Sequence, residues 1–392
     1  RFTELTTDDA GRISREGCWA FLSRVALYEG TWQKFRGNEE RGRELLDIAA
    51  KAAKQVIDSK AFSLFKPDAL KEKAQKYMFI LEDAKSNPAG IQKSANKEYV
   101  FARRYDESLA PIGKNITKAN LINMVWVSRK FANMYICQNG LPIYINGVKN
   151  AQFQEYATLT SEWENRDNRM RYTLAKPGDY FWNNSNPGCR LTWNDASDQS
   201  NAAIKNFTPN SGTGYHNQKW ASERLVKDNF EGFDYPIIRY AEVLLNYAEA
   251  VYERDGKIED TDLNISLNLV RTRVNPNMPG LTNKLVNDNG LSMREEIRRE
   301  RTVELFHEGF RLDDLKRWKT AEVEMPQDIL GVKWAGKDFE TKWSACPYPR
   351  NSEGVIVMET GRQWQDKHYL FPLPKDQLQL NPNLKQNPGW DK

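Results

Sequence analysis

The sequence predicts a mostly α fold in which tetratricopeptide-like helical hairpins support a large irregular, loop-rich region. Two stretches with helical periodicity, one near the start and one in the third quarter of the chain, predict the hairpins. The long middle, about residues 60 to 235, has little regular periodicity. Because solenoid repeats normally stack on their immediate neighbours, we expect a large insertion to interrupt the helical scaffold there.

The first hairpin is predicted at residues 10–60. Its first helix runs from Ile13 to Tyr28 and is closed by Gly30, a residue typical of helix ends. Apolar side chains at helical spacing form the expected face of this helix: Cys18, Phe21, Leu22, Val25 and Tyr28. The second helix runs from about Arg41 to Ser59, and its face is Leu45, Ala49, Ala52, Ala53 and Val56. The small alanines allow the two helices to approach closely.

Further hairpins are predicted at residues 236–320. Pro236 suits the first turn of a helix, where its missing N–H costs nothing. Two helices with apolar stripes are then expected to pack together. The stripes are Ile237, Ala241, Leu244, Leu245, Ala248 and Val251 on one helix, and Leu263, Leu267, Val270 and Val274 on the next. Both stripes fall within about forty residues, near the length of a tetratricopeptide repeat.

The last predicted helical segment begins with a capping box formed by Ser292 and Glu295. It carries Met293, Ile297 and Leu305 on one face, is broken at Gly309 and resumes from Phe310 to Trp318. Arg301 falls on the same apolar face. Because a buried charge needs a partner, we expect an ion pair there.

Composition excludes several classes of protein. Apolar residues make up 40% and charged residues 28% of the 392 residues, which argues against a disordered chain. The 57 Lys and Arg barely outnumber the 53 Asp and Glu, and no basic stripe of the kind that binds nucleic acid is present. No apolar run is long enough to span a bilayer. The cysteines lack C-x-x-C spacing, so a zinc site has no support, and connectivity stays open for the pair Cys189 and Cys346. No ligand spacing identifies a metal site, and a cation in the irregular region stays open.

Residues 177–220 are the most informative irregular stretch. They combine aromatic side chains with many asparagines, between Gly and Pro residues that indicate loops. Aromatic faces can stack on the C–H faces of sugar rings, while amides exchange hydrogen bonds with hydroxyl groups. This combination suits a neutral, polyhydroxylated ligand. The alternative, that the rings form the core of an irregular subdomain, fits the composition equally well.

Enzyme hypotheses have less support. The three histidines are far apart in the sequence and form no H-E-x-x-H motif, and we expect His307 to cap a helix end rather than act as a base. No G-x-S-x-G elbow or phosphate-binding loop is present. A glycosidase pair needs only two carboxylates close in space, so three residues near the aromatic stretch stay open as candidates: Asp167, Asp179 and Asp195. The role expected first for each of them is nevertheless a solvated or loop-capping one.

Several short motifs in order along the chain resemble the SusD/RagB family. The similar segments are Ala26–Trp32, Asn139–Ile143 (NGLPI), Arg166–Arg169 (RDNR), Gly214–Lys219, Ile238–Ala250, Ile297–Arg301, Glu308–Arg311, Asp314–Trp318, Phe371–Pro374 and Asn381–Trp390. Each motif is weak alone, but the series in this order is specific. The resemblance implies that the family's lipobox, its first helical repeat and part of its second would precede Arg1.

The resemblance implies a non-catalytic protein held by an N-terminal lipid on the outer face of the outer membrane. It implies capture of an oligosaccharide or polysaccharide and its delivery to a SusC-like TonB-dependent transporter, with no cofactor, although some relatives handle peptides. A peptide-binding RagB-type subunit and a glycoside hydrolase are the alternatives.

The resemblance and the aromatic stretch together give the expected organisation of the chain. We expect a single domain over residues 1–392, with the irregular ligand-binding insertion at 61–235 and an irregular C-terminal region at 321–392 that packs on the scaffold. The candidate ligand-binding residues are four aromatic rings for stacking and two polar side chains for hydroxyl contacts: Tyr180, Trp182, Trp193 and Trp220, with Asn183 and Arg190.

Overall fold

The structure is a computed structural model, and it confirms the mostly α fold. It describes residues 12–118, 126–158, 160–176, 212–224, 226–338, 346 and 348–390, and the backbone of residues 180–181 and 189–190. The α-helices described are α1 (Arg15–Lys34), α2 (Glu39–Ser59), α3 (Ala74–Met78), α4 (Ile116–Lys118), α5 (Arg129–Met134), α6 (Asn168–Thr173), α7 (Tyr240–Asp255), α8 (Asp260–Asn264), α9 (Leu267–Thr272), α10 (Asn283–Asp288), α11 (Met293–Glu304), α12 (Arg311–Arg317), α13 (Ala321–Glu324) and α15 (Lys375–Leu380).

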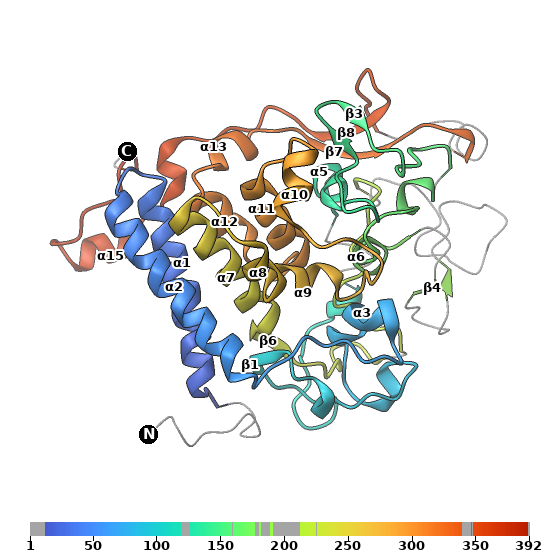
Figure 1. Cartoon of the computed structure of the whole chain (residues 1–392), viewed down its shortest axis with the longest axis horizontal. Coiled ribbons are helices and arrows are strands. Elements are labelled where there is room, and N and C mark those ends of the chain that lie inside the picture. Colours follow the sequence, from blue (N-terminus) through green and yellow to red (C-terminus); the bar gives the residue numbers. More distant parts are fainter. Residues whose placement is uncertain are drawn as a thin grey trace.

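Strands are short and pair only in twos within the described part of the chain. The antiparallel pairs are β1 (Tyr99–Arg103) with β6 (Tyr235–Arg239), β2 (Tyr144–Ile145) with β3 (Val148–Lys149), β4 (Tyr180–Phe181) with β5 (Cys189–Arg190), and β7 (Ile329–Lys333) with β8 (Val355–Glu359). Figure 1 shows the long helices gathered on one side of the molecule and the loop-rich parts with the short strands on the other.

Helix α7 is the centre of the scaffold. It packs against α1, α2, α9 and α11, and its side chains are buried almost all round, so it lies inside a layer of helices. The stripe predicted on the following segment is also confirmed, because Leu263, Leu267, Val270 and Val274 are all buried. That segment is divided into α8 and α9 by a break at Ile265 and Ser266.

The contact between α1 and α2 is confirmed, but the predicted end of the first helix is wrong. Helix α1 continues through Gly30 to Lys34. Gly30 faces α2 instead, where a Cβ would lie 3.0 Å from Cγ of Leu46 and 3.2 Å from the carbonyl oxygen of Gly42. Gly42 is matched, since a Cβ there would lie 2.9 Å from Cβ of Lys34. Glycine in these helices therefore serves close packing of the backbones.

The predicted apolar face of α1 is also wrong. Phe21 is 51% exposed, and Leu22, Val25 and Cys18 are exposed as well. The buried face consists mainly of small residues: Gly17, Ala20, Ser23, Ala26, Leu27, Gly30 and Thr31. The close backbone approach to α2 selects the small side chains for burial, and the larger apolar ones are turned outward.

The segment that begins at Pro236 does not start a helix, contrary to the prediction. It is strand β6, and Ala102 of β1 lies opposite Pro236 in the antiparallel register. The extended backbone buries Ile238 and turns Ile237 to solvent. The helix begins only at Tyr240, whose N–H donates to the carbonyl oxygen of Glu98 at 2.8 Å. A proline tolerated at a sheet edge looks, in sequence, like one tolerated in a first helical turn.

The ion pair predicted for Arg301 is confirmed. Its Nε lies 2.9 Å from a carboxylate oxygen of Asp314 on α12, and its Nη1 donates to Oδ1 of Asn246 on α7 at 2.8 Å. The break at Gly309 separates α11 from α12 as expected. Ser292 caps α11 by accepting the N–H of Glu295 at 3.4 Å.

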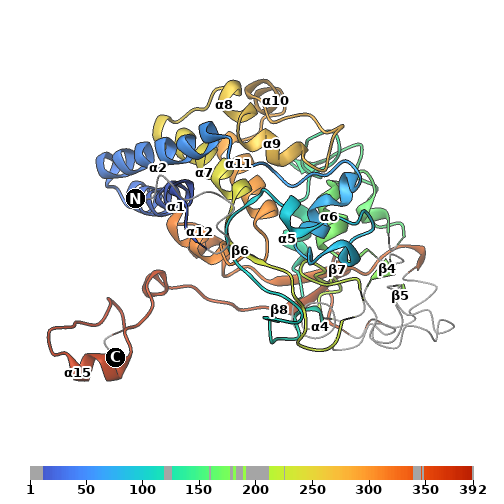
Figure 2. The ribbon, with the colours of Figure 1, turned by 90° about the horizontal axis from the view of Figure 1, so that it is seen from below.

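The C-terminal residues form an arm. Tyr369 is buried against Trp32 of α1, so the base of the arm is fixed to the scaffold. Beyond it, residues 371–390 close on themselves, with Gln386 bonded to the backbone of Leu373 in both directions at 2.8 and 2.9 Å. Figure 2 shows this end of the chain, including α15, standing away from the body of the molecule.

Candidate functional site

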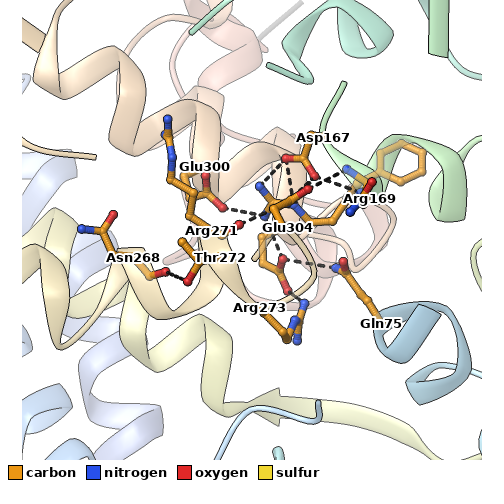
Figure 3. Close-up of polar contacts among 12 residues, drawn as sticks. Gln75, Asp167, Arg169, Asn268, Arg271, Thr272, Arg273, Glu300 and Glu304 are labelled. Carbon is orange, nitrogen blue, oxygen red and sulfur yellow. Dashed lines mark hydrogen bonds and ion pairs between the residues drawn. The ribbon is translucent and has the colours of Figure 1, made fainter. Parts of the chain in front are cut away.

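A buried network of charges joins the helical scaffold to the irregular region (Figure 3). Glu304, at the C-terminal end of α11, lies at its centre and is fully buried. Its carboxylate accepts hydrogen bonds from Arg273 at 2.5 Å, Arg239 at 2.7 Å and Arg169 at 3.0 Å. Because these arginines come from the chain after α9, from β6 and from α6, one carboxylate connects three distant segments.

The same network contains the RDNR motif. Asp167 caps α6 by accepting the N–H of Arg169 at 2.9 Å and pairs with the guanidinium of Arg169 at 2.6 Å. It also accepts from Nδ2 of Asn275 at 2.8 Å. Arg166 is buried and donates to the carbonyl oxygens of Tyr135 and Glu162. The motif is therefore structural. Both carboxylate oxygens of Asp167 are bonded within the protein, so Asp167 is no longer a candidate catalytic acid.

Electrostatics keep this network charged. Burial by itself would raise the pKa of the Glu304 carboxyl, but Arg273, Arg239 and Arg169 together hold that pKa well below its usual range. The pKa of the Arg239 guanidinium is raised despite burial by Glu308 and Glu304. The opposite charges hold Glu304 and Arg239 in their ionised forms, so neither has a proton to exchange near neutral pH. The network is a frame for the neighbouring loops rather than a reactive centre.

The predicted aromatic site lies mostly outside the described residues. Trp182, Asn183 and Trp193 are not among them, nor are Asp179 and Asp195. For two other candidates the backbone alone is described, and it brings them together. Tyr180 and Arg190 face each other as partners in the β4–β5 pair.

The prediction that Trp220 stacks on a sugar is wrong. It is only 4% exposed, and its ring packs against Phe79, Phe233 and Tyr235 with centroids 4.7, 6.0 and 5.2 Å away. Its Nε1 donates to the carbonyl oxygen of His307 at 3.2 Å. Both the faces and the polar edge of the indole are occupied by the protein, so this ring belongs to the core.

A cavity of about 570 Å³ lies between α5, the end of α11, α12 and β7. Apolar side chains such as Phe131 and Phe310 line much of it, and polar groups such as Gln327 and Arg311 lie among them. One wall is the indole of Trp126, which is 42% exposed. An open aromatic ring with hydrogen-bonding groups around it is the arrangement predicted from sequence for residues 177–220.

The chain holds Trp126 firmly at this cavity. Its backbone pairs with His216, and the next residue, Val127, donates its N–H to the carbonyl oxygen of Tyr215 at 3.0 Å. Gly212, at a φ of +53°, lies against the ring, because a Cβ there would be 2.1 Å from Cδ2 of Trp126. Gly212 belongs to the C-terminal part of the aromatic stretch at residues 177–220. The cavity therefore adjoins the C-terminal part of the aromatic stretch.

Sequence reasoning missed Trp126. It lies in a short apolar run, Met124 to Val127, that predicts burial, and nothing local distinguishes its exposed ring from a core residue. Gly212, which packs against the ring, is far away in the sequence. The pairing of residues 126–127 with 215–216 is a tertiary property that no periodicity reveals.

The histidines have no catalytic arrangement. Burial lowers the pKa of His216 to about 4. Burial, then the Lys219 charge, lowers that of His307 to about 4. Nδ1 of His307 lies 3.2 Å from Nδ2 of Asn217, so its predicted role as a helix cap is wrong. Cys346 has a free thiol. Within the described ranges, no group of His, Cys, Asp and Glu is suited to hold a metal ion, and no helix is long and apolar enough to cross a membrane.

Several solved structures have a fold similar to that of this chain. A SusD-like carbohydrate binding protein from Bacteroides fragilis matches with a TM-score of 0.71 and 23% identity, over 98% of this chain and 67% of that one. A second SusD-like protein from the same organism matches with a TM-score of 0.64 and 22% identity, over 99% and 67%. Surface glycan-binding protein A from Bacteroides uniformis matches with a TM-score of 0.51 and 17% identity, over 97% and 62%. No curated protein sequence matches the chain.

The fold and the site thus define a helical-repeat scaffold that carries a loop-rich face with an aromatic-walled cavity. Residues 86–390 match the model of the SusD family. The chain belongs to the SusD family, which confirms the resemblance seen in its sequence motifs. It spans about two thirds of the length of the first two solved relatives.

Proposed function

We propose that this protein is a cell-surface glycan-binding protein, which captures an oligosaccharide without cleaving it and passes it to a SusC-like TonB-dependent transporter. Membership of the SusD family supports this proposal, as does the likeness to structures described as carbohydrate binding. The position on the outer membrane, the lipid anchor and the transporter partner rest on the family resemblance.

The observation that carries the glycan part of the proposal is the cavity beside Trp126. A half-open indole offers a flat apolar face to a sugar ring, and Gln327 and Ser128 in the same lining offer groups for hydroxyl contacts. The aromatic stretch supplies five further candidate residues: Tyr180, Trp182, Asn183, Arg190 and Trp193. We propose that these five residues extend the binding surface from the cavity.

The use of the charges supports the proposal that the protein binds its ligand without cleaving it. Asp167, the one carboxylate of the candidate glycosidase set within the described residues, is buried and bonded to Arg169 and Asn275. A general acid must reach the glycosidic oxygen of a bound sugar. The carboxylates of the charge network are closed to a ligand in the same way, which supports binding without hydrolysis.

A glycan array followed by isothermal titration calorimetry tests the proposal. We expect the wild-type protein to bind at least one oligosaccharide class and to release no reducing ends from it. Trp182→Ala and Trp193→Ala should each weaken that binding about tenfold, since aromatic contacts contribute on the order of 1 kcal/mol or more. Trp19→Ala, an exposed tryptophan on α1, is the matched control and should leave the affinity unchanged.

Three outcomes would count against the proposal. Reducing ends released by the purified protein would favour a hydrolase. Retention of a peptide, with no glycan bound on the array, would favour a RagB-type peptide-binding subunit. Unfolding of both tryptophan variants would show that these rings are core.

A further inference from the structure

We propose that the cavity beside Trp126 selects acidic saccharides, whose carboxylate or sulfate group enters a hollow lined by Arg298 and Arg311. The inference rests on the proposed glycan-binding function and adds a ligand class to it. The hollow has a volume of about 150 Å³ and lies against the larger cavity, because Thr302, Arg311 and Glu324 line both. The two spaces therefore share a wall.

Arg298 is the first reason to expect an anion there. Its side chain is 10% exposed, and its Nε and Nη2 have no hydrogen-bond partner. The nearest carboxylate oxygens belong to Glu295, 3.6 Å from Nη1, and Glu253, 3.9 Å from Nη2. A guanidinium buried with unused donors is costly unless something accepts from it. Burial lowers the pKa of Arg298, consistent with incomplete compensation of its charge.

The position of Arg298 is fixed by aromatic rings rather than by a carboxylate. Its guanidinium lies 4.7 Å from the ring centroid of Trp318 and 5.1 Å from that of Phe35. Held against these rings, the guanidinium lies in the wall of the hollow, and its buried Nε and Nη2 have no acceptor within the protein. Such a preorganised fork suits the oxygens of a carboxylate or sulfate.

Three arginines, Arg298, Arg299 and Arg311, line the hollow together with two carboxylates, Glu295 and Glu324. Glu295 lies 3.6 Å from Nη1 of Arg298 and leaves its Nε and Nη2 without an acceptor. Glu324 is shared between Lys130, with which it forms an ion pair, and Arg311, 3.4 Å away. Glu253 is likewise engaged by Lys34 at 2.8 Å and by Arg294 at 2.7 Å.

Arg311 is the residue that joins the two spaces. Its Nη1 donates to Oγ1 of Thr302 at 2.9 Å, and its side chain is 37% exposed, so it is both held in place and accessible. Burial, opposed by Glu324, lowers its pKa. With Arg298 inside and Arg311 at the junction, the hollow has two guanidinium groups for one anionic substituent.

Matched pairs of saccharides test the inference by titration calorimetry. The probes are trigalacturonate against its methyl ester, κ-carrageenan tetrasaccharide against its desulfated form, and inorganic sulfate alone. We expect the acidic member of one pair to bind at least tenfold more tightly than its neutral partner, as charge-assisted hydrogen bonds would give. The pair that shows the preference distinguishes a carboxylate from a sulfate ligand.

Substitutions of the two arginines test whether they produce the preference for acidic saccharides. Arg311→Gln, and separately Arg298→Gln, should reduce the ratio of acidic to neutral affinity to near one, with folding checked by thermal unfolding. Arg41→Gln, which changes the same charge at an exposed position on α2, should retain the ratio. Equal binding of both members by the wild type, or a ratio that survives Arg311→Gln, would overturn the inference. Binding of sulfate alone, with no preference in either pair, would also overturn it. If neither member of either pair bound, and the array gave no ligand, the proposed function itself would fail.

Discussion

Glu304→Gln should strongly destabilise the protein. The substitution keeps the shape of the side chain but removes a fully buried negative charge that three guanidinium groups approach within 3.0 Å. Removing one partner of a buried ion pair leaves the others uncompensated, which typically costs about 3–5 kcal/mol. Glu98 and Glu308 also contact Arg239 and absorb part of that loss. We therefore expect a loss of at least about 3 kcal/mol.

Urea unfolding, followed both by tryptophan fluorescence and by far-ultraviolet circular dichroism, measures this loss. The total stability of most proteins is about 5–15 kcal/mol, so the shift in midpoint should be large. Glu44→Gln is the control, because Glu44 is 60% exposed and pairs only with Arg41 at the surface, where the change should cost less than about 1 kcal/mol. A Glu304→Gln protein within 0.5 kcal/mol of wild type would refute the view that this network holds the fold together.

Three further outcomes follow from the structure. Gly42→Ala should destabilise the protein by about 1–3 kcal/mol in urea unfolding, since a Cβ would lie 2.9 Å from Lys34, and an unchanged midpoint would show that α1 and α2 separate freely. Burial would raise the pKa of Glu249, but Arg317 holds it at about 2, below the ordinary 4.5, so its stabilisation is present above pH 4.5 and lost toward pH 2. The stability difference between wild type and Glu249→Gln should narrow over that range, and a constant difference would contradict the assignment. Trp220→Ala should cost about 3–5 kcal/mol without changing the preference among glycans on an array. A folded variant with an altered preference among glycans would show that Trp220 contacts the ligand after all.

Much of the scaffold was predictable because most of its helices bury the apolar side chains that recur at helical spacing. The stripe from Leu263 to Val274 and the alanine face of α2 are buried as their spacing predicts. Helix α1 breaks the rule, since its most apolar side chains are outside. Two glycines on facing helices set the contact there, and a single-helix pattern cannot show that Gly30 has Gly42 opposite.

The site was less predictable, for a related reason. Sequence composition located an aromatic, asparagine-rich stretch, but whether a ring is open depends on what packs on it. Trp220 has Phe79 on one side, from a segment about 140 residues away in the chain, and is therefore core. Trp126 has the backbone of Gly212 behind it and remains half open. The two tryptophans differ in tertiary surroundings and not in any local signal.

Trp126→Ala asks whether the rigid helical frame presents this indole to a sugar ring. Titration calorimetry with an array-selected oligosaccharide should show affinity weakened about tenfold or more, while thermal unfolding of the variant stays within a few degrees of wild type. The same affinity as wild type, in a folded variant, would contradict this role of Trp126.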